Sequence, residues 1–321
     1  MKIINFKIID EAKRRVAYIN EMIESRHAAE LVAEGEKYHS DQLAHIAQAI
    51  CDRGARVVLI AGPSSSGKTS TSHKLCLELL EHGKQPVALS LDNWYLNGDL
   101  TPLKPDGTKD YESVYAIDLD QLEQDLKALV AGKEIALPTF NFADERREYP
   151  GETLSLDQDA VMVIEGIHAL NPILTAHLDD ADKYKIYAAP MSPVSLDGET
   201  WIPTYVHRLL RRMSRDYRTR GKSPQQTIAG WESVREGEAQ WIEPFMDQAD
   251  AQFDTSMLYE LPAIRYAVET ALQSVPAASA EYPIAERLLF YLSFFECLEA
   301  SFIPRTSILR EFIGGSQFNV G

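Results

Sequence analysis

The sequence predicts an α/β fold in which a five-stranded, mainly parallel sheet is flanked by helices. Five short apolar runs of strand-forming residues recur along the chain, at residues 57–61, 86–91, 160–164, 183–189 and 251–258. Segments whose apolar residues recur at helical spacing separate these runs, most clearly at 118–131. A glycine-containing loop and a second helical pattern follow the first run directly. Alternation of this kind predicts parallel strands that are joined by helical crossovers.

The two ends of the chain predict helical extensions of this central unit. Residues 10–50 carry apolar side chains at helical spacing in two segments, and Gly35 is expected to interrupt the second. Residues 281–312 read as a strongly apolar helix that packs on the core or on another subunit, which leaves a homo-oligomer open. We therefore expect a helical extension at 1–54, a central domain at 55–265 and a helical tail at 266–321.

The loop after the first strand has the spacing of a phosphate-binding loop. It reads GPSSSGKTS and fits the pattern G-x-x-x-x-G-K-T. Glycines let the backbone wrap closely around phosphates, and the following helix directs its free N–H groups and its positive dipole end at the anion. This pattern predicts a P-loop NTPase fold that binds a nucleoside triphosphate, through Gly62, Pro63, Ser64, Ser65, Ser66, Gly67, Lys68, Thr69 and Ser70.

Two of these residues have specific expected tasks. Lys68 is placed to reach the β- and γ-phosphates, and the hydroxyl of Thr69 is placed to bind Mg²⁺. ATP and Mg²⁺ are therefore the expected cofactors.

Acidic residues end the second and third strands. Asp92 follows the run at 86–91, and Glu165 follows the run at 160–164. Functional side chains gather at the carboxyl edge of an open α/β sheet. Position alone leaves Asp92 equally consistent with a turn-capping aspartate. Because a phosphate-binding loop is present, we favour Glu165 as a ligand of Mg²⁺ or of its waters over a simple strand end.

A small hairpin and a basic helix complete the predicted elements. Residues 118–131 form an amphipathic helix, with Asp118 as its expected N-cap, and 135–149 alternate as a hairpin outside the main sheet. Residues 207–222 are the most basic segment of the chain. A solvated cationic face explains most such segments. Here we favour a helix whose arginines close over phosphates, since phosphoryl transfer needs movable cations.

Composition limits the class of protein. The formal net charge of −16 and the pI of about 5.0 argue against a nucleic-acid partner, which requires a basic surface. The three cysteines have no metal-site or disulfide spacing, which suits a reducing cytoplasm. No apolar run is long enough to cross a membrane, and the first residues lack the core of a secretion signal. We expect a cytoplasmic protein that acts on a small molecule.

The motifs, taken together, resemble those of the uridine kinase and phosphoribulokinase group of P-loop kinases. GPSSSGKTS, SLDNWY, PTFNF, VIEGI and RRMSRDYRTRG occur in the family's order between residues 56 and 261. The likeness is greatest to bacterial uridine kinase-like nucleoside kinases. The C-terminal stretch ILREFIGGS of this chain also resembles that branch. The resemblance implies ATP- and Mg²⁺-dependent transfer of a phosphoryl group to a primary hydroxyl, with the 5′-hydroxyl of a nucleoside as the first candidate.

The resemblance also implies roles by position. Asp92 would contact the 5′-hydroxyl and act as general base, with Tyr95 nearby. Glu112 would contact ribose hydroxyls in place of the family's aspartate. Phe140 and Phe142 would hold the base. The remaining expected contributors are basic residues: Arg212 at the nucleoside, Arg215 and Arg220 in the lid, and Lys222 where the family often has arginine.

One departure concerns the base. Where uridine and cytidine kinases read the pyrimidine with a histidine, this chain has Glu145, followed by Arg146 and Arg147. A carboxylate accepts hydrogen bonds but donates none, so it prefers a different edge of a base. Glu145 and Arg147 are therefore candidate substrate-binding residues whose ligand stays open.

Two other functions remain as alternatives. The same scaffold phosphorylates other alcohols, such as sugar phosphates, glycerate or pantothenate. A regulator that binds ATP without turnover would need no substrate base, so the presence of Lys68, Asp92 and Glu165 argues against it.

Overall fold

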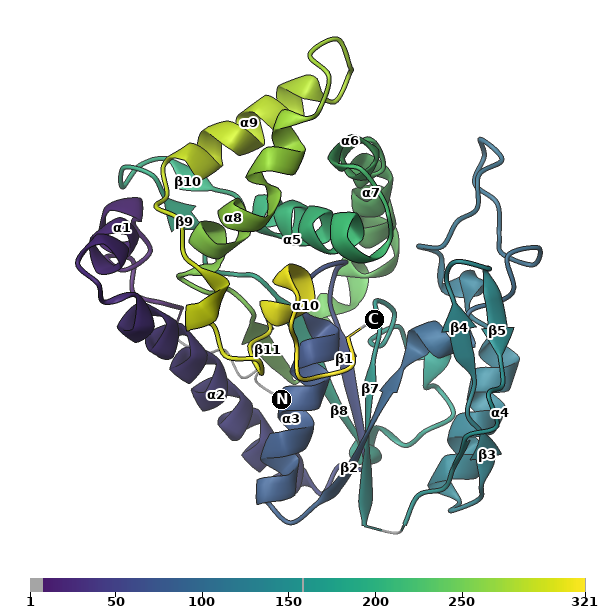
Figure 1. Ribbon diagram of the computed structural model, residues 1–321. Coiled ribbons are helices and arrows are strands. Elements are labelled where there is room, and N and C mark those ends of the chain that lie inside the picture. The colour runs from purple at the N-terminus through teal and green to yellow at the C-terminus, as the bar shows by residue number, and fades with distance from the viewer. Residues whose placement is uncertain (1–7, 158, 321) are drawn as a thin grey trace.

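The computed structural model describes residues 8–157 and 159–320 and confirms the α/β fold class. Its central sheet has five strands in the order β11-β8-β1-β7-β2, and every neighbouring pair is parallel (Figure 1). The strands are β1 (Val57–Ala61), β2 (Gln85–Ser90), β7 (Ala160–Glu165), β8 (Lys183–Ala189) and β11 (Ala251–Asp254). The fifth strand ends at Asp254 rather than at the expected residue 258. The strand order places β1, which precedes the phosphate-binding loop, at the centre of the sheet.

Each face of the sheet has its own apolar core, because side chains along a strand alternate between faces. Val58 and Ile60 of β1 contribute to one buried cluster, together with Val163 of β7. Leu59 of β1 and Ile164 of β7 contribute to the other. The strands are buried on both faces, which explains why they read as continuous apolar runs in the sequence.

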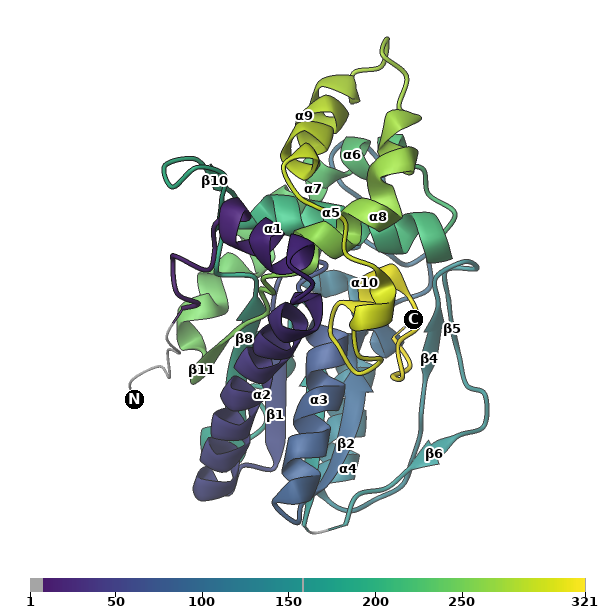
Figure 2. The same cartoon turned by 60° about the vertical axis from the view of Figure 1, so that its left-hand side comes forward.

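Helices cover both faces and the carboxyl edge of the sheet. One face is covered by α3 (Lys68–Glu81) and, beside it, α2 (Ala28–Arg53), while α4 (Leu119–Val130) contributes to the opposite core. The other helices are α1 (Val16–Glu24), α5 (Thr204–Thr219), α6 (Pro224–Ala229), α7 (Trp231–Trp241), α8 (Glu260–Gln273), α9 (Tyr282–Ser293) and α10 (Arg310–Ile313). Figures 1 and 2 show that α5, α8 and α9 lie beyond the end of the sheet at which α3 begins.

Short antiparallel strand pairs lie outside the main sheet. The expected hairpin is formed by β4 (Thr139–Asn141) and β5 (Arg146–Glu148). β3 (Ile135–Ala136) pairs with β6 (Thr153–Leu154), and β9 (Val194–Ser195) pairs with β10 (Trp201–Ile202). The β4–β5 hairpin contacts the segment that follows β2, so it lies at the carboxyl edge of the sheet.

Two expectations for the helical ends were wrong in detail. Gly35 does not interrupt α2 but lies inside it. The ring of Tyr259 packs so closely there that a Cβ on Gly35 would lie 2.9 Å from it, which favours glycine at this position. The expected helix over 281–312 ends at Ser293, after which the chain turns back and buries Phe295 and Leu298. Residues 1–7 and 321 of the expected extensions lie outside the described residues.

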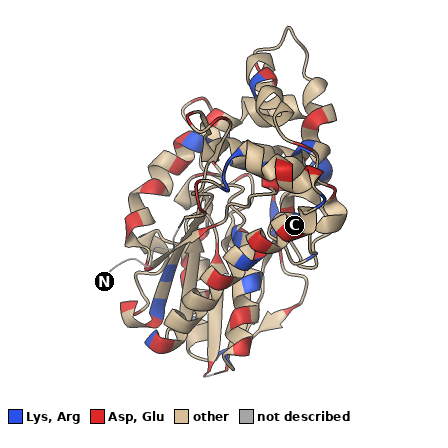
Figure 3. Cartoon of the chain, turned by 90° about the vertical axis from the view of Figure 1, so that its left-hand side faces the viewer, with Lys and Arg blue, Asp and Glu red and all other residues tan. Residues whose placement is uncertain are grey.

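Across residues 8–157 and 159–320, none of the helices has the length and apolar character needed to span a membrane. Figure 3 shows Asp and Glu distributed over the helices on one side of the molecule.

Candidate active site

The loop between β1 and α3 has the backbone of a phosphate cradle. A Cβ on Gly62 would lie 1.9 Å from the carbonyl oxygen of Ala188, so only glycine fits there. Gly67, which precedes α3, has a φ of +91°, and Ser65 has a φ of +59°. Left-handed residues of this kind let a loop form a concavity into which its backbone N–H groups point. The hydroxyls of Ser65 and Ser66 are buried and have no hydrogen-bond partner among the described residues. Unpartnered buried donors fit a loop that receives phosphate oxygens.

Lys68, Thr69 and Glu165 meet beside this loop. Lys68 is only 8% exposed, and its ammonium group donates to the carbonyl of Pro63 at 3.3 Å. The hydroxyl of Thr69 donates to Glu165 at 3.1 Å. Burial, with the nearby charge of Asp92, raises the pKa of Glu165 to about 7. A hydroxyl and a carboxylate fit Mg²⁺, which takes few protein ligands and completes its shell with water and phosphate oxygens. No cluster of three or more His, Cys, Asp or Glu suited to a metal occurs among the described residues.

Asp92 lies at the carboxyl end of β2, in the short helix Leu91–Trp94. The turn there is capped by Ser90, whose hydroxyl accepts from the N–H of Asp92, so the Asp92 carboxylate is not the cap. Burial raises the pKa of Asp92, while the charges of Lys68, Arg220 and Arg215 oppose that rise. The structure therefore brings the predicted base together with three of the predicted cations.

Aromatic side chains from two segments meet next to Asp92. The ring centroid of Phe140 lies 5.5 Å from that of Tyr95 and 5.0 Å from that of Phe142. Phe140 is buried, whereas Phe142 is 49% exposed. The guanidinium of Arg220 lies over the ring of Phe142, 5.5 Å from its centroid. The hairpin thus places Phe140 and Phe142 beside the segment after β2 that carries Asp92.

Glu112 lies at the border between this aromatic group and the arginines of α5. Burial raises the pKa of Glu112 to about 7, and the neighbouring charge of Arg212 opposes the rise. Its side chain packs on Gly237 of α7, where a Cβ would lie 2.4 Å from the Cβ of Glu112. Arg212 donates to the hydroxyl of Ser64 at 2.6 Å. Glu112 and Arg212 are thus brought beside the phosphate-binding loop.

Glu145 and Arg147 are held by partners of their own. Glu145 has a φ of +49° at the tip of the hairpin and forms an ion pair with Lys109. Arg147 donates to Asp118, the N-cap of α4, at 2.8 Å. The structure does not pair either residue with Asp92 or with the phosphate-binding loop. Lys222 follows the end of α5 and is exposed.

The arginines of α5 converge on a buried carboxylate that the sequence analysis did not single out. Asp216 is fully buried. Its carboxylate lies 3.0 Å from Arg215, 3.5 Å from Arg212 and 3.6 Å from Arg220. Asp216 is part of the RRMSRD motif, but only the folded helix shows that it faces three arginines at once.

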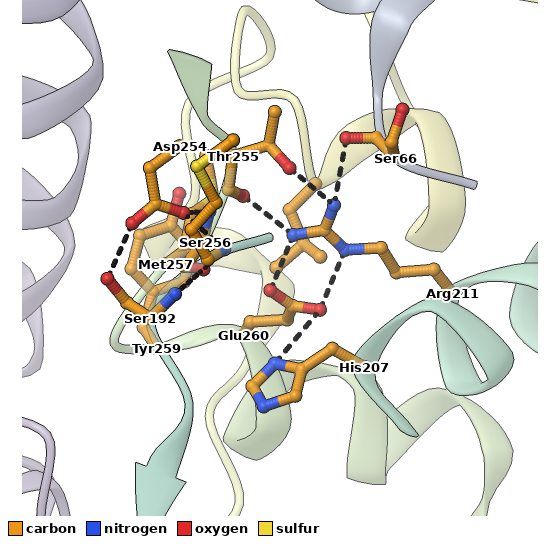
Figure 4. Close-up of polar contacts among 12 residues, drawn as sticks. Ser66, Ser192, His207, Arg211, Asp254, Thr255, Ser256, Met257, Tyr259 and Glu260 are labelled. Atoms are coloured by element: carbon orange, nitrogen blue, oxygen red, sulfur yellow. Dashed lines mark hydrogen bonds and ion pairs between the residues drawn. The ribbon is translucent and has the colours of Figure 1, made fainter. Parts of the chain in front are cut away.

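Other carboxylates and arginines hold the backbone of the phosphate-binding loop at Ser64 and Ser66. Arg208 contacts the carbonyl of Ser64 at 3.2 Å and pairs with Glu238, which accepts from the N–H of Ser64. Arg211 donates to the carbonyl of Ser66 at 3.2 Å and to the carboxylate of Glu260. Figure 4 shows the Arg211 guanidinium enclosed by Glu260, Thr255 and Ser66. These carboxylates lie 30 or more residues away in sequence, so local patterns give no sign of them.

Comparisons with known proteins agree with the motifs. Residues 57–258 match the model of the phosphoribulokinase / uridine kinase family. A uridine kinase of Macrococcus caseolyticus is 31% identical over 195 residues, which cover 60% of this chain and 85% of that protein. A uridine kinase of Staphylococcus aureus strain JH9 is 30% identical over 200 residues, covering 62% and 86%. Among solved structures, a putative fructose transport system kinase from Silicibacter sp. TM1040 aligns with a TM-score of 0.49 at 20% identity, covering 65% of this chain and 98% of that one.

Proposed function

The chain belongs to the phosphoribulokinase / uridine kinase family of kinases, and on this premise we propose that it transfers the γ-phosphoryl group of ATP to the 5′-hydroxyl of a nucleoside. Residues 55–265 form the catalytic unit in this proposal. The observation that carries it is the convergence of Asp92, Lys68 and the lid arginines at the carboxyl edge of the sheet. A base, an acceptor site and movable cations are the parts that phosphoryl transfer requires.

The residues divide the reaction between them. The loop from Gly62 to Ser70 holds the phosphates through its N–H groups. Asp92 orients the acceptor hydroxyl and takes its proton as the oxygen attacks the γ-phosphorus. Lys68, Arg215 and Arg220 offset the negative charge that spreads over the transferring group. Mg²⁺, held by Thr69 and Glu165, would neutralise phosphate charge. Positioning of the reactants and neutralisation of charge supply most of the catalysis.

The acceptor side supports a nucleoside. Phe142 is half exposed and lies against the buried Phe140 and Tyr95, an aromatic group that suits a flat base. Glu112 lies where the resemblance places contacts to ribose hydroxyls, and its raised pKa leaves it partly protonated near neutrality, able to donate as well as accept.

A second candidate is a kinase for another small alcohol. The observation that favours it is the ion pair between Glu145 and Lys109 at the position where pyrimidine kinases carry a histidine. Each member of that pair neutralises the other, so Glu145 is not free to take the histidine's place at a pyrimidine edge. A third, an ATP-binding regulator, lacks a reason to keep Asp92 beside Lys68.

The test is release of ADP from ATP and Mg²⁺ with a panel of acceptors. The panel contains the common nucleosides, sugar phosphates, glycerate and pantothenate. We expect turnover with a nucleoside. Turnover only with another alcohol would move the function to that substrate, and ATP binding without turnover on any acceptor would favour the regulator.

A further inference from the structure

The end of the chain returns across the phosphate-binding loop. Residues 303–320, here called the C-terminal strap, begin at the buried Ile303 and contain α10. Figures 1 and 2 both show α10 beside the first turn of α3. The ring of Phe318 stacks on His73 of α3, with centroids 5.3 Å apart. The strap therefore packs on α3, the helix that follows the phosphate-binding loop. The match to the family model ends at residue 258, so the strap lies outside that match, although residues 308–316 resemble the tail of the bacterial branch.

The strap places a carboxylate on the first turn of α3. Glu311 accepts from the N–H of Ser70 at 3.2 Å and from its hydroxyl at 2.8 Å. Glu311 is 5% exposed, so its charge is largely removed from water. Ile308 approaches the loop as well, and its Cγ2 would lie 2.5 Å from a Cβ on Gly67. An acidic side chain thus occupies hydrogen-bond donors of the loop–helix junction.

These donors are ones that a nucleotide needs. The N–H groups of the loop and of the first helical turn hold the phosphates in a loop of this type. A carboxylate is an anion with two acceptor oxygens, so it satisfies the Ser70 donors as a phosphate oxygen would. It also adds negative charge beside Glu165, where it contributes to the raised pKa of that carboxyl. A phosphate group and the Glu311 carboxylate cannot take the same donors, and their like charges repel.

We propose that the C-terminal strap is an autoinhibitory element: Glu311 occupies a phosphate position on the first turn of α3, and nucleotide must displace it to bind. The inference rests on the proposed function in that it takes the loop to be a nucleotide site, but it does not depend on the acceptor.

The strap is attached to the helix that carries the lid arginines. Ser214 of α5 donates its hydroxyl to the carbonyl of Phe312 at 3.0 Å. Arg218 donates to the carbonyl of Glu311 at 3.0 Å, and the Arg211 guanidinium lies 5.2 Å from the ring centroid of Phe312. Displacement of Glu311 would therefore disturb the contacts of the strap with α5, the helix that carries Arg212 and Arg215. Nucleotide entry and the placement of the arginines are coupled through these contacts.

The competing explanation is that Glu311 only caps α3 from another part of the chain. The two explanations predict opposite effects of nucleotide. A cap that stays in place would hold the strap more firmly when the loop is filled, whereas an inhibitory contact would be released.

The experiment measures binding of Mg²⁺–ADP by calorimetry, without an acceptor, to the full-length protein and to Glu311→Gln. The substitution keeps shape and removes charge. We expect ADP to bind roughly five- to twenty-fold more tightly to Glu311→Gln, given the strength of a carboxylate at a helix N-terminus. Glu286→Gln, an exposed change on α9, is the control and should leave affinity unchanged. Equal or weaker binding to Glu311→Gln would overturn the proposal.

A second measurement uses only the unaltered protein, in case the variant folds poorly. Backbone hydrogen exchange is compared with and without Mg²⁺–ADP. We expect exchange to slow at 62–70 and to quicken at 305–320 when ADP binds. Slower exchange of the strap with ADP would overturn the proposal and make the strap part of the nucleotide site. Failure of both proteins to bind ADP would refute the nucleotide site itself and this inference with it, whereas ADP binding without turnover on any acceptor would refute only the proposed reaction.

Discussion

The hydroxyl of Thr69 donates a hydrogen bond of 3.1 Å to the carboxylate of Glu165, which joins the first turn of α3 to the end of β7. The pairing of β1 with β7 produces this contact, because Ile60 lies opposite Glu165 in the register. The chain is continuous from Ile60 through the loop to Thr69. Two motifs that are nearly a hundred residues apart in sequence thereby become one candidate metal site.

The aromatic pair of the hairpin yields a prediction that separates binding from stability. Phe142→Ala should raise the KM for the acceptor roughly tenfold, because stacking of a base on an aromatic ring is worth about 1–3 kcal/mol. It should lower the free energy of unfolding by less than about 1 kcal/mol, since Phe142 is 49% exposed. Phe140→Ala, at a site 6% exposed, should cost about 3 kcal/mol or more.

Steady-state kinetics and urea unfolding check this prediction. Tyr149→Ala is the matched control, since Tyr149 is an equally exposed aromatic residue that follows the hairpin. An unchanged KM in Phe142→Ala would show that the hairpin does not hold the acceptor.

Asp216 is predicted to act as a positioning residue for the arginines of α5. Asp216→Asn removes the charge that lies within 3.6 Å of Arg212, Arg215 and Arg220. We expect kcat to fall roughly 10- to 100-fold, with a smaller change in the KM for ATP, since in the proposed mechanism the arginines stabilise charge that develops during transfer. Unfolding should become easier by roughly 1–3 kcal/mol, because the partly buried Arg212 and Arg215 lose their charged partner.

The control is Asp247→Asn, an exposed change that should alter neither quantity. If Asp216→Asn loses stability but keeps its kcat, Asp216 serves the fold alone.

The raised pKa of Glu112 gives a pH dependence with a definite sign. The pKa is raised to about 7 from an ordinary value of 4.5, so the folded protein binds more protons than the unfolded chain between these values. The contribution of this group to stability is therefore present below about pH 4.5 and is lost as pH rises through about 7. Glu112→Gln carries no such charge. Its free energy of unfolding, relative to the unaltered protein, should increase by roughly 1–3 kcal/mol from about pH 5 to about pH 8.

Urea unfolding at the two pH values measures the difference. A relative stability that is constant or decreases with pH would mean that Glu112 is charged in the folded protein throughout this range.

Most of the fold could be predicted from the sequence because its signals are local. The five strands are short apolar runs, and burial on both faces makes them visible without knowledge of their neighbours. The loop motif is contiguous, so its spacing alone predicted the loop after β1 and the start of α3. The course of the tail was not, because its turn after Ser293 depends on contacts such as that of Leu298 with the carbonyl of Pro262.

The candidate site was predicted as far as single residues reveal it. Glu165 and the arginines stand out by residue type and position, whereas the role of Asp92 follows from the family resemblance. The partners of these residues do not stand out. Glu238, Glu260 and Glu311 read as ordinary surface acids in sequence, yet each is buried against an arginine or against the loop itself. Glu145 stood out as a candidate, but its pairing with Lys109 became visible only in the fold.

The most direct test of the central claim is a comparison of Asp92→Asn with the unaltered protein in a single turnover with ATP, Mg²⁺ and the best acceptor of the panel. The change keeps the shape of the side chain and removes its ability to take a proton. We predict that ATP affinity stays within about threefold while the rate of phosphoryl transfer falls at least roughly 100-fold, the size of a general-base contribution. A rate close to that of the unaltered protein would contradict the assignment of Asp92 and, with it, the mechanism proposed for this site.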